Sequence, residues 1–295
     1  MKYGQRSFIF TFLFIPVVIY VIFVAIPYVT SMAVSFTKWR GLTMDLPFNG
    51  VNNFVKLFND PNFWNALGHN AIALVVLPPV IITMALIFAF LFTQGIRGSG
   101  FFRITFFFPQ VMSAIIVGVL WSFIYHPTLG MLNGLLGLLG ITSLQNFPWL
   151  GDPSTVFGAI LVVTVWQAVG FYMVLFITGM ESIPPHFYEA ARLDGANSFM
   201  MFTRITIPML WEAIRTAIVF LALGAMDMYA IVMIMTNGSG GPSRGADVVP
   251  RYMVEAAFTN GEWGYATAMA VVLMLIILAL SILSLRFTRR ETLEY

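Results

Sequence analysis

The sequence predicts an all-α polytopic membrane protein with six transmembrane helices. Hydrophobic residues make up 59% of the 295 residues and charged residues only 9%, whereas soluble domains carry roughly a quarter charged residues. The mean hydropathy is +0.86, and the stretch from Ile104 to Gly151 contains no Asp, Glu, Lys or Arg. Because so few charges cannot cover a water-facing surface, most of the chain is expected to face lipid.

Hydropathy and charge divide the chain into six apolar segments within a single transmembrane domain, residues 1–295. A backbone in lipid must satisfy its own hydrogen bonds, so each segment is expected to be helical. The alternation of apolar and polar residues that marks a transmembrane β-barrel is missing. The first segment is longer than the core of a cleavable signal peptide and is interpreted as a retained span. The segments are about 8–36, 68–93, 103–125, 155–179, 209–236 and 264–286.

Lysine and arginine residues near the ends of the spans predict the orientation, because cytoplasmic loops carry an excess of both. With the N-terminus inside, nine basic residues fall on the cytoplasmic side, five fall outside, and Arg215 lies just inside the fifth segment. The chain is therefore expected to lie in the cell (inner) membrane with both termini on the cytoplasmic side. The inner group is Lys2, Arg6, Arg97, Arg103, Arg192, Arg204, Arg286, Arg289 and Arg290; the outer group is Lys38, Arg40, Lys56, Arg244 and Arg251.

Composition also argues against several functional classes. A net charge of +2 without a basic stripe gives no reason to expect nucleic-acid binding, and the absence of cysteine rules out a disulfide, a thiol catalyst or a cysteine metal site. His69, His126 and His186 are scattered over different membrane ends, so no metal site, catalytic residue or cofactor is expected. An intramembrane enzyme would need facing catalytic groups, and Asp227 is the lone acidic residue deep in a span.

The inner loop over residues 181–208 carries the strongest local signals. Pro184 and Pro185 suit the first turn of a helix, where the missing N–H costs nothing. Asp194-Gly195 then supplies a stop, because glycine readily adopts the left-handed conformation that ends helices. Asn197 or Ser198 can cap a second helix. The loop is predicted to form a short helix, a tight corner and another helix that reaches Pro208.

This loop resembles the EAA loop of ABC importer permeases. The resemblance rests on Glu189-Ala190-Ala191, Gly195 at a spacing of four, and Ile205-x-Ile207-Pro208; the family more often has leucine where this chain has Ile207. It implies the type I ABC importer permease fold and a coupling helix that docks into a groove on a separate ATPase subunit. The coupling residues it implies are Tyr188, Glu189, Ala190, Ala191, Asp194, Gly195 and Pro208.

Further stretches resemble the carbohydrate branch of these permeases. They are residues 54–64 with Asn70, 127–133, 149–153, 227–229 and 264–268. The resemblance implies four kinds of partner: a second, related permease, two cytoplasmic ATPase subunits, an extracytoplasmic solute-binding protein, and a sugar or oligosaccharide as the solute. The chain looks like the first permease of such a pair. The glycine-rich residues 237–245 lack the Gly-Lys-Ser/Thr ending of a phosphate loop and are interpreted as an outer loop that contributes to the binding-protein contact.

Two alternatives remain within transport. An ABC permease could carry glycerol phosphate, a polyol or another small polar solute, although a phosphate should attract positive charge near the midplane and the spans offer only Arg215 near an end. A secondary transporter would commonly show inverted repeats, and the two halves of this chain show no convincing repeat.

Polar residues within the spans are the candidates for the solute pathway. An ionisable residue inside the membrane is a functional hypothesis by default, which selects Asp227 together with Gly224 and Tyr229. The alternative for Asp227 is a structural carboxylate satisfied by a neighbouring helix or water. In the fourth segment Thr164, Gln167 and Phe171 fall at helical spacing and could bind a sugar through hydrogen bonds and an aromatic face. Their alternative is to join helices to one another.

Overall fold

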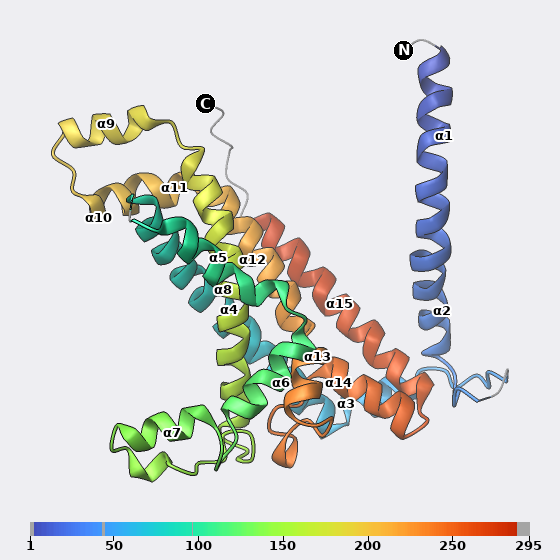
Figure 1. Cartoon of the computed structure of the whole chain (residues 1–295). Coiled ribbons are helices and arrows are strands. Elements are labelled where there is room, and N and C mark those ends of the chain that lie inside the picture. The colour runs from blue at the N-terminus through green and yellow to red at the C-terminus, as the bar shows by residue number, and fades with distance from the viewer. Residues whose placement is uncertain (1–2, 43–44, 96, 288–295) are drawn as a thin grey trace. The chain divides into compact units, whose positions relative to one another are not determined.

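The computed structural model describes residues 3–42, 45–95 and 97–287 (Figure 1). These residues fold into helices joined by loops, so the all-α prediction is confirmed. The α-helices are α1 (Tyr3–Tyr20), α2 (Ile26–Val34), α3 (Asn52–Phe58), α4 (Pro61–Thr93), α5 (Ser99–Val111), α6 (Ala114–Ile124), α7 (Met131–Leu138), α8 (Val156–Glu181), α9 (Pro185–Leu193), α10 (Ser198–Met201), α11 (Ile207–Met209), α12 (Trp211–Met226), α13 (Tyr229–Met235), α14 (Val249–Val254) and α15 (Trp263–Phe287).

Shorter helical segments of other types connect several of these helices. Three π-helical segments continue directly from an α-helix: η1 (Val21–Ala25), η3 (Phe202–Thr206) and η5 (Glu255–Thr259). Two short 3₁₀ segments, η2 (Thr142–Leu144) and η4 (Pro242–Arg244), lie in loops.

Four helical stretches of the described chain are long and apolar enough to cross a membrane: Thr11–Val34, Pro61–Thr93, Val156–Glu181 and Trp263–Ser284. Two bent pairs reach the same length and composition only when each pair counts as one span. The pair α5 and α6 bends by 101°, and the stretch Ser198–Met209 bends by 68° against α12. The third predicted segment, 103–125, is thus two helices, and the fifth, 209–236, is divided between α12 and α13.

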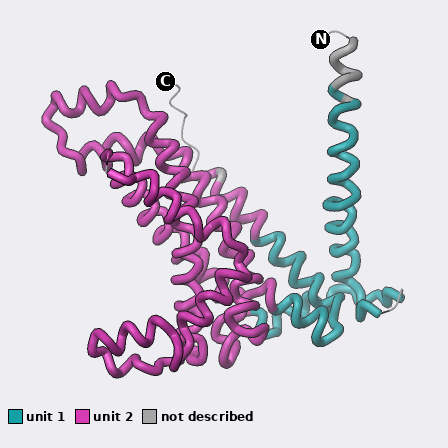
Figure 2. Tube along the Cα trace, in the orientation of Figure 1, with its two compact units in different colours: residues 1–63, 252–276 teal, residues 64–251, 277–295 magenta. Residues whose placement is uncertain are grey.

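The chain forms two compact units (Figure 2), residues 1–63 with 252–276 and residues 64–251 with 277–295. In the first unit the buried Asn53 donates to the carbonyl oxygens of Ser35 and Thr37, both at 2.8 Å. Asp60 accepts hydrogen bonds from the hydroxyls of Tyr252 and Tyr265 at 2.6 and 2.5 Å. These polar contacts tie together segments that are distant in the sequence.

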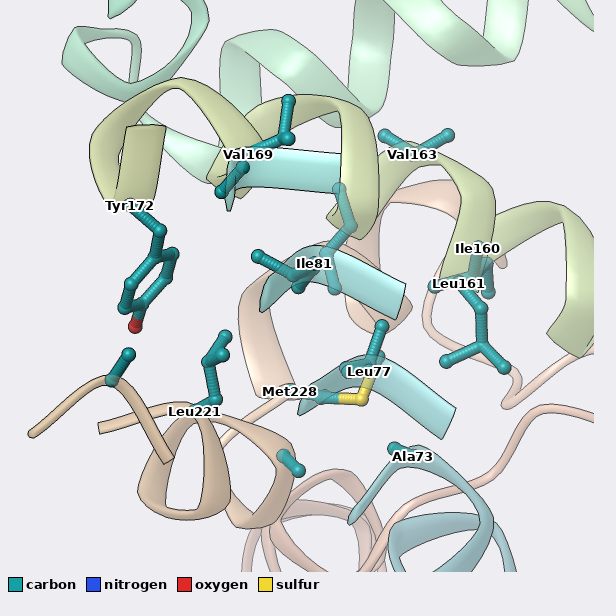
Figure 3. Close-up of a cluster of buried hydrophobic side chains, with 14 of the residues drawn as sticks. Ala73, Leu77, Ile81, Ile160, Leu161, Val163, Val169, Tyr172, Leu221 and Met228 are labelled. Atoms are coloured by element: carbon teal, nitrogen blue, oxygen red, sulfur yellow. The ribbon is translucent and has the colours of Figure 1, made fainter. Parts of the chain in front are cut away.

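The core of the second unit lies where α4, α8, α12 and α13 pack together. Ile81 of α4 and Ile160 of α8 are fully buried, and Tyr172 of α8 points toward Leu221 of α12 (Figure 3). α5 packs on α8 at Gly170, where a Cβ atom would lie 1.8 Å from the carbonyl oxygen of Phe106. Glycine is therefore required there, since small residues let membrane helices approach closely.

The break between α5 and α6 is stabilised by side chains. Met112 leaves the helical conformation with φ −74° and ψ 142°, and the Ser113 hydroxyl accepts from the N–H of Ile116 as the N-cap of α6. The Gln167 amide of α8 donates to the carbonyl oxygen of Met112 at 3.1 Å. Because a backbone carbonyl in lipid needs a partner, this bond makes the bend tolerable inside an apolar segment.

Candidate coupling loop and membrane pathway

Helix α9 begins at Pro185, directly after Pro184 in an extended conformation with ψ 132°. Both prolines fit this start, since Pro185 has no N–H to leave unsatisfied. Glu189 and Ala190 are exposed, and Ala191 is half-buried. The helix therefore presents its acidic residue and one of the two alanines of the motif on its open side.

The end of α9 is a Schellman motif. Gly195 has φ +78°, the left-handed conformation that glycine adopts without a steric penalty. The Gly195 N–H donates to the carbonyl oxygen of Arg192 at 3.1 Å, and the Ala196 N–H donates to that of Ala191 at 2.9 Å. These two bonds are the pair that defines the motif. They fix the corner after Asp194 that the sequence predicts.

The second part of the loop starts at Asn197, whose side chain accepts from the N–H of Met200 at 2.8 Å. The chain then runs through α10, η3 and α11, so the second predicted helix is partly π-helical and contains Pro208 in α11. Across the loop, the hydroxyl oxygens of Tyr188 and Thr206 lie 3.0 Å apart. This bond joins α9 to the end of η3 and holds α9 as a rigid arm.

In the coupling loop, residues 181–208, Tyr188 and Phe202 pack against the core, while other parts of the loop are exposed. A cleft of about 380 Å³ lies between it and the ends of α4 and α8, lined by Tyr188, Glu189 and Arg192 among others. On the loop itself Leu193 is 90% exposed and Phe199 73% exposed. Large apolar side chains this exposed, beside an acidic residue on a rigid helix, form a surface suited to a protein partner.

Asp227 lies at the break between α12 and α13, with φ −113° and ψ 69°. Its side chain is exposed, as is Gly224 one turn earlier, while Tyr229 is half-buried at the start of α13. The sequence placed Asp227 near the middle of a span, and the structure shows that this point is a helix break.

The candidates on α8 separate into two kinds. Thr164 donates to the carbonyl oxygen of Ile160 in its own helix at 3.0 Å, and Gln167 donates to Met112 across helices as described above. The Gln167 bond is the kind expected of the structural alternative, because it joins two helices, whereas the Thr164 bond stays within α8 and joins none. Phe171 is 38% exposed and remains open to a ligand or another protein.

Sequence reasoning missed a polar cluster that supports the Asp227 break. Asn70 of α4 is fully buried, and its amide donates to the carbonyl oxygen of Ala225 at 2.8 Å. Asp247 is also fully buried and pairs with Arg251, whose Nη2 lies 2.6 Å from Oδ2. The spacing of four between Asp247 and Arg251 was a usable signal, whereas nothing local marks Asn70 as a partner of α12.

The described chain is thus an apolar helical protein with candidate membrane spans and an exposed loop. The chain belongs to the family described as the binding-protein-dependent transport system inner membrane component, which matches residues 66–292. It is thus an ABC importer permease subunit, not an enzyme, in a system that works with a solute-binding protein. Membership of this family decides against a secondary transporter.

Several relatives match along almost the whole chain. The diacetylchitobiose uptake system permease protein NgcF of Streptomyces coelicolor is 38% identical over 292 residues, covering 96% of this chain and 82% of the relative. The probable ABC transporter permease protein YurN of Bacillus subtilis is 36% identical, covering 96% and 97%. The lactose transport system permease protein LacF of Rhizobium radiobacter is 32% identical, covering 92% and 90%.

Solved structures share the fold. A crystal structure of a bacterial ABC transporter for the import of alginate matches with a TM-score of 0.77 at 22% identity, covering 98% of this chain and 97% of the other. The same type of transporter in complex with an alginate pentasaccharide-bound periplasmic protein gives 0.80, covering 98% and 96%. The fold is therefore the type I ABC importer permease fold that the resemblance implied.

Proposed function

We propose that this permease forms half of a translocation pathway for a sugar or oligosaccharide delivered by an extracytoplasmic binding protein. The relatives supply the support for the solute class, since NgcF is named for diacetylchitobiose and LacF for lactose. The structure contributes an exposed carboxylate, Asp227, and an exposed ring, Phe171, on helices that pack against each other. Hydrogen-bonding groups combined with aromatic faces suit a sugar.

The coupling loop is the observation that carries the proposed mechanism. ATP-driven movement of an external subunit reaches membrane helices only through an element that moves as a body. α9 fits this requirement because the Schellman motif fixes its end and the Tyr188–Thr206 bond fixes its side. Glu189, Ala190 and Leu193 remain exposed for a groove on an ATPase subunit. ATP hydrolysis belongs to that separate subunit.

The first span supports a second permease as partner. None of the residues in its most apolar window is buried inside the chain. A helix in lipid gains stability by packing on another helix, and a second permease offers such a surface. The complete importer in this proposal contains both permeases, two cytoplasmic ATPase subunits and the binding protein, with both termini of this chain in the cytoplasm as the charge distribution favours.

Crosslinking tests the coupling role directly, because the chain contains no cysteine and single cysteines add no background. Cysteines placed one at a time at positions 189, 190 and 193 should crosslink to an ATPase subunit in an actively importing complex. A matched control is Leu138→Cys on α7, which is 86% exposed but lies at the opposite end of the second unit from α9 (Figure 1). Absence of crosslinks from residues 185–197 during import would refute the proposal.

Substitution of Asp227 tests the solute pathway. Asp227→Ala should weaken uptake or change the range of sugars that compete for it, and Asp227→Asn should do so less because the amide still forms hydrogen bonds with hydroxyl groups. Uptake of a labelled sugar, with unlabelled sugars as competitors, measures both effects. An unchanged competition profile together with a lower thermal midpoint would assign Asp227 to the structural alternative.

A further inference from the structure

Asn70 joins two parts of the second unit that are far apart in sequence. Its Nδ2 donates to the carbonyl oxygen of Ala225 at 2.8 Å and lies 3.5 Å from that of Met226, in the last turn of α12 before Asp227. Its Oδ1 accepts from the N–H of Val249 at 2.9 Å, at the first residue of α14. One fully buried side chain thus connects the break at Asp227 to the segment that follows the glycine-rich outer loop.

That segment, residues 237–251, is internally braced. The buried Asp247 carboxylate binds Arg251 through both oxygens and also binds Arg244, whose Nη1 lies 2.7 Å from Oδ2. Arg251 in turn donates to the carbonyl oxygen of Gly238 at 2.9 Å. Separating the partners of a buried ion pair is costly, because it leaves an uncompensated buried charge. Displacement at one end of the segment therefore moves the other end as well.

Both atoms that Asn70 binds need this partner. The last carbonyl groups of a helix and the first N–H groups of the next have no intrahelical partner. Ala225 and Val249 are both fully buried, and leaving a buried polar group unsatisfied is costly. Because Ala225 and Val249 receive their partners from one side chain, the segment and the break cannot move apart without breaking at least one of these bonds.

We propose that Asn70 is a positioning residue that transmits movement of the outer segment 237–251 to the helix break at Asp227. A binding protein that docks on the outer loop then changes the geometry of the break directly. This inference rests on the proposed function only in taking this loop as the docking side. It assigns a role in the activation of ATP hydrolysis to a residue of α4 whose hydrogen bonds go neither to the coupling loop nor to Asp227 itself.

Two variants remove the connection in different ways. Asn70→Leu removes both bonds while keeping a similar volume. Val249→Pro removes the N–H from which the Asn70 oxygen accepts, at a helix start where proline is tolerated, and it also replaces the fully buried Val249 side chain. The control is Asn65→Leu, on the same helix: the Asn65 amide donates to the Arg244 carbonyl oxygen at 3.0 Å and thus contacts the same segment away from the break.

The measurement is the ratio of binding-protein-stimulated to basal ATPase activity in the reconstituted complete importer with its solute. Coupling between sites in proteins spans about 5- to 150-fold, so both variants should lower this ratio by about tenfold while basal activity stays within about twofold of wild type. The control should keep the ratio within about twofold. Equal ratios in wild type and both variants would overturn the proposal, as would a parallel loss of basal and stimulated activity.

A spin-label distance provides a test that needs no partner. Cysteines at Leu223 on α12 and at Ser239 in the segment are both exposed and have no competing thiols. The permease alone should show a narrow distance distribution that becomes broad in Asn70→Leu and stays narrow in Asn65→Leu. An unchanged distance distribution in Asn70→Leu would overturn the inference even if the importer transports sugar. A wild-type importer whose ATPase activity is not stimulated by the binding protein would instead count against the proposed function.

Discussion

The hydroxyl oxygens of Tyr188 and Thr206 lie 3.0 Å apart across the coupling loop, although the residues are eighteen positions apart in the chain. A neutral hydrogen bond of this kind contributes a net ~0.5–1.5 kcal/mol. Its energetic value is small, but its position is important. It joins α9 directly to the end of η3, next to the packing of Phe187 and Phe202 on the core.

Tyr188→Phe removes this bond with little change in volume. We expect the amount of solute transported per ATP hydrolysed to fall by about two- to tenfold, because α9 can then tilt when pushed. Thr206→Val should give a similar loss, and the double variant should lose no more than either single one, since all three lack the same contact. Fully additive losses would show that the two hydroxyls act independently.

Gly195 should be sensitive to backbone conformation alone. No atom lies within 4 Å of an added Cβ, but φ is +78°, and a left-handed conformation costs most residues about 1–2 kcal/mol. Gly195→Val should therefore reduce uptake and binding-protein-stimulated ATP hydrolysis while the protein still inserts in the membrane. Gly195→Asn should be milder, because asparagine tolerates this conformation. Equal activity of the valine and asparagine variants would contradict this account.

Two glycines on α8 form a matched pair for stability. Gly170→Ala would place a methyl group against the backbone of Phe106, whereas a Cβ at Gly158 meets nothing within 4 Å. Overpacking costs about 1–3 kcal/mol, so Gly170→Ala should lower the thermal midpoint of the purified protein and Gly158→Ala should leave it unchanged. If both variants have the same thermal midpoint as wild type, α5 and α8 are not in close contact.

Asp60 predicts a pH dependence in the first unit. Burial by itself would raise the pKa of Asp60, but hydrogen bonds from Tyr252, Tyr265 and the N–H groups of Asn62 and Phe63 outweigh burial and lower the pKa below its ordinary value of 3.8. A carboxyl group whose pKa is lower in the folded state stabilises the protein above the unfolded pKa, about 3.9, and loses that contribution as the pH falls through the folded pKa.

The stability difference between wild type and Asp60→Asn should accordingly be constant from pH 7 to about pH 5 and shrink below about pH 4. Thermal midpoints of both proteins across this range measure it. The variant itself is the control, because the asparagine oxygen can still accept from a tyrosine hydroxyl. A difference that does not change with pH would show that Asp60 has no shifted pKa.

The sequence predicted the helical class and the local backbone structure of residues 181–208 well because their signals are local. Apolar runs mark spans, and Pro185, Gly195 and Asn197 act within one or two turns of their own positions. The helix breaks could not be located in this way. α4 contains Pro78 and Pro79 without a break, while the chain breaks at Met112, three residues after Pro109 of α5. A proline in an apolar segment therefore does not by itself locate a break.

The reason is that the breaks depend on distant partners. Gln167 reaches Met112 across 55 positions of the chain, and Asn70 reaches Ala225 across 155. The same dependence on distant partners explains why the roles of the candidate pathway residues could not be read from the sequence. Gln167 was selected for its polarity, and only the folded chain shows that its amide donates to a backbone carbonyl oxygen. Asp227 was selected for its charge, and the structure adds that it lies at a break.

The division of the fifth segment at Asp227 has a consequence for the energy of conformational change. An intact helix that bends in lipid must give up internal hydrogen bonds, and each one lost raises the barrier. At the Asp227 break such internal hydrogen bonds are already absent. The Asn70 amide instead donates to the carbonyl oxygen of Ala225 at the end of α12. The angle between α12 and α13 can therefore change through the exchange of a few side-chain contacts. Repeated conformational change then requires no further loss of backbone hydrogen bonds.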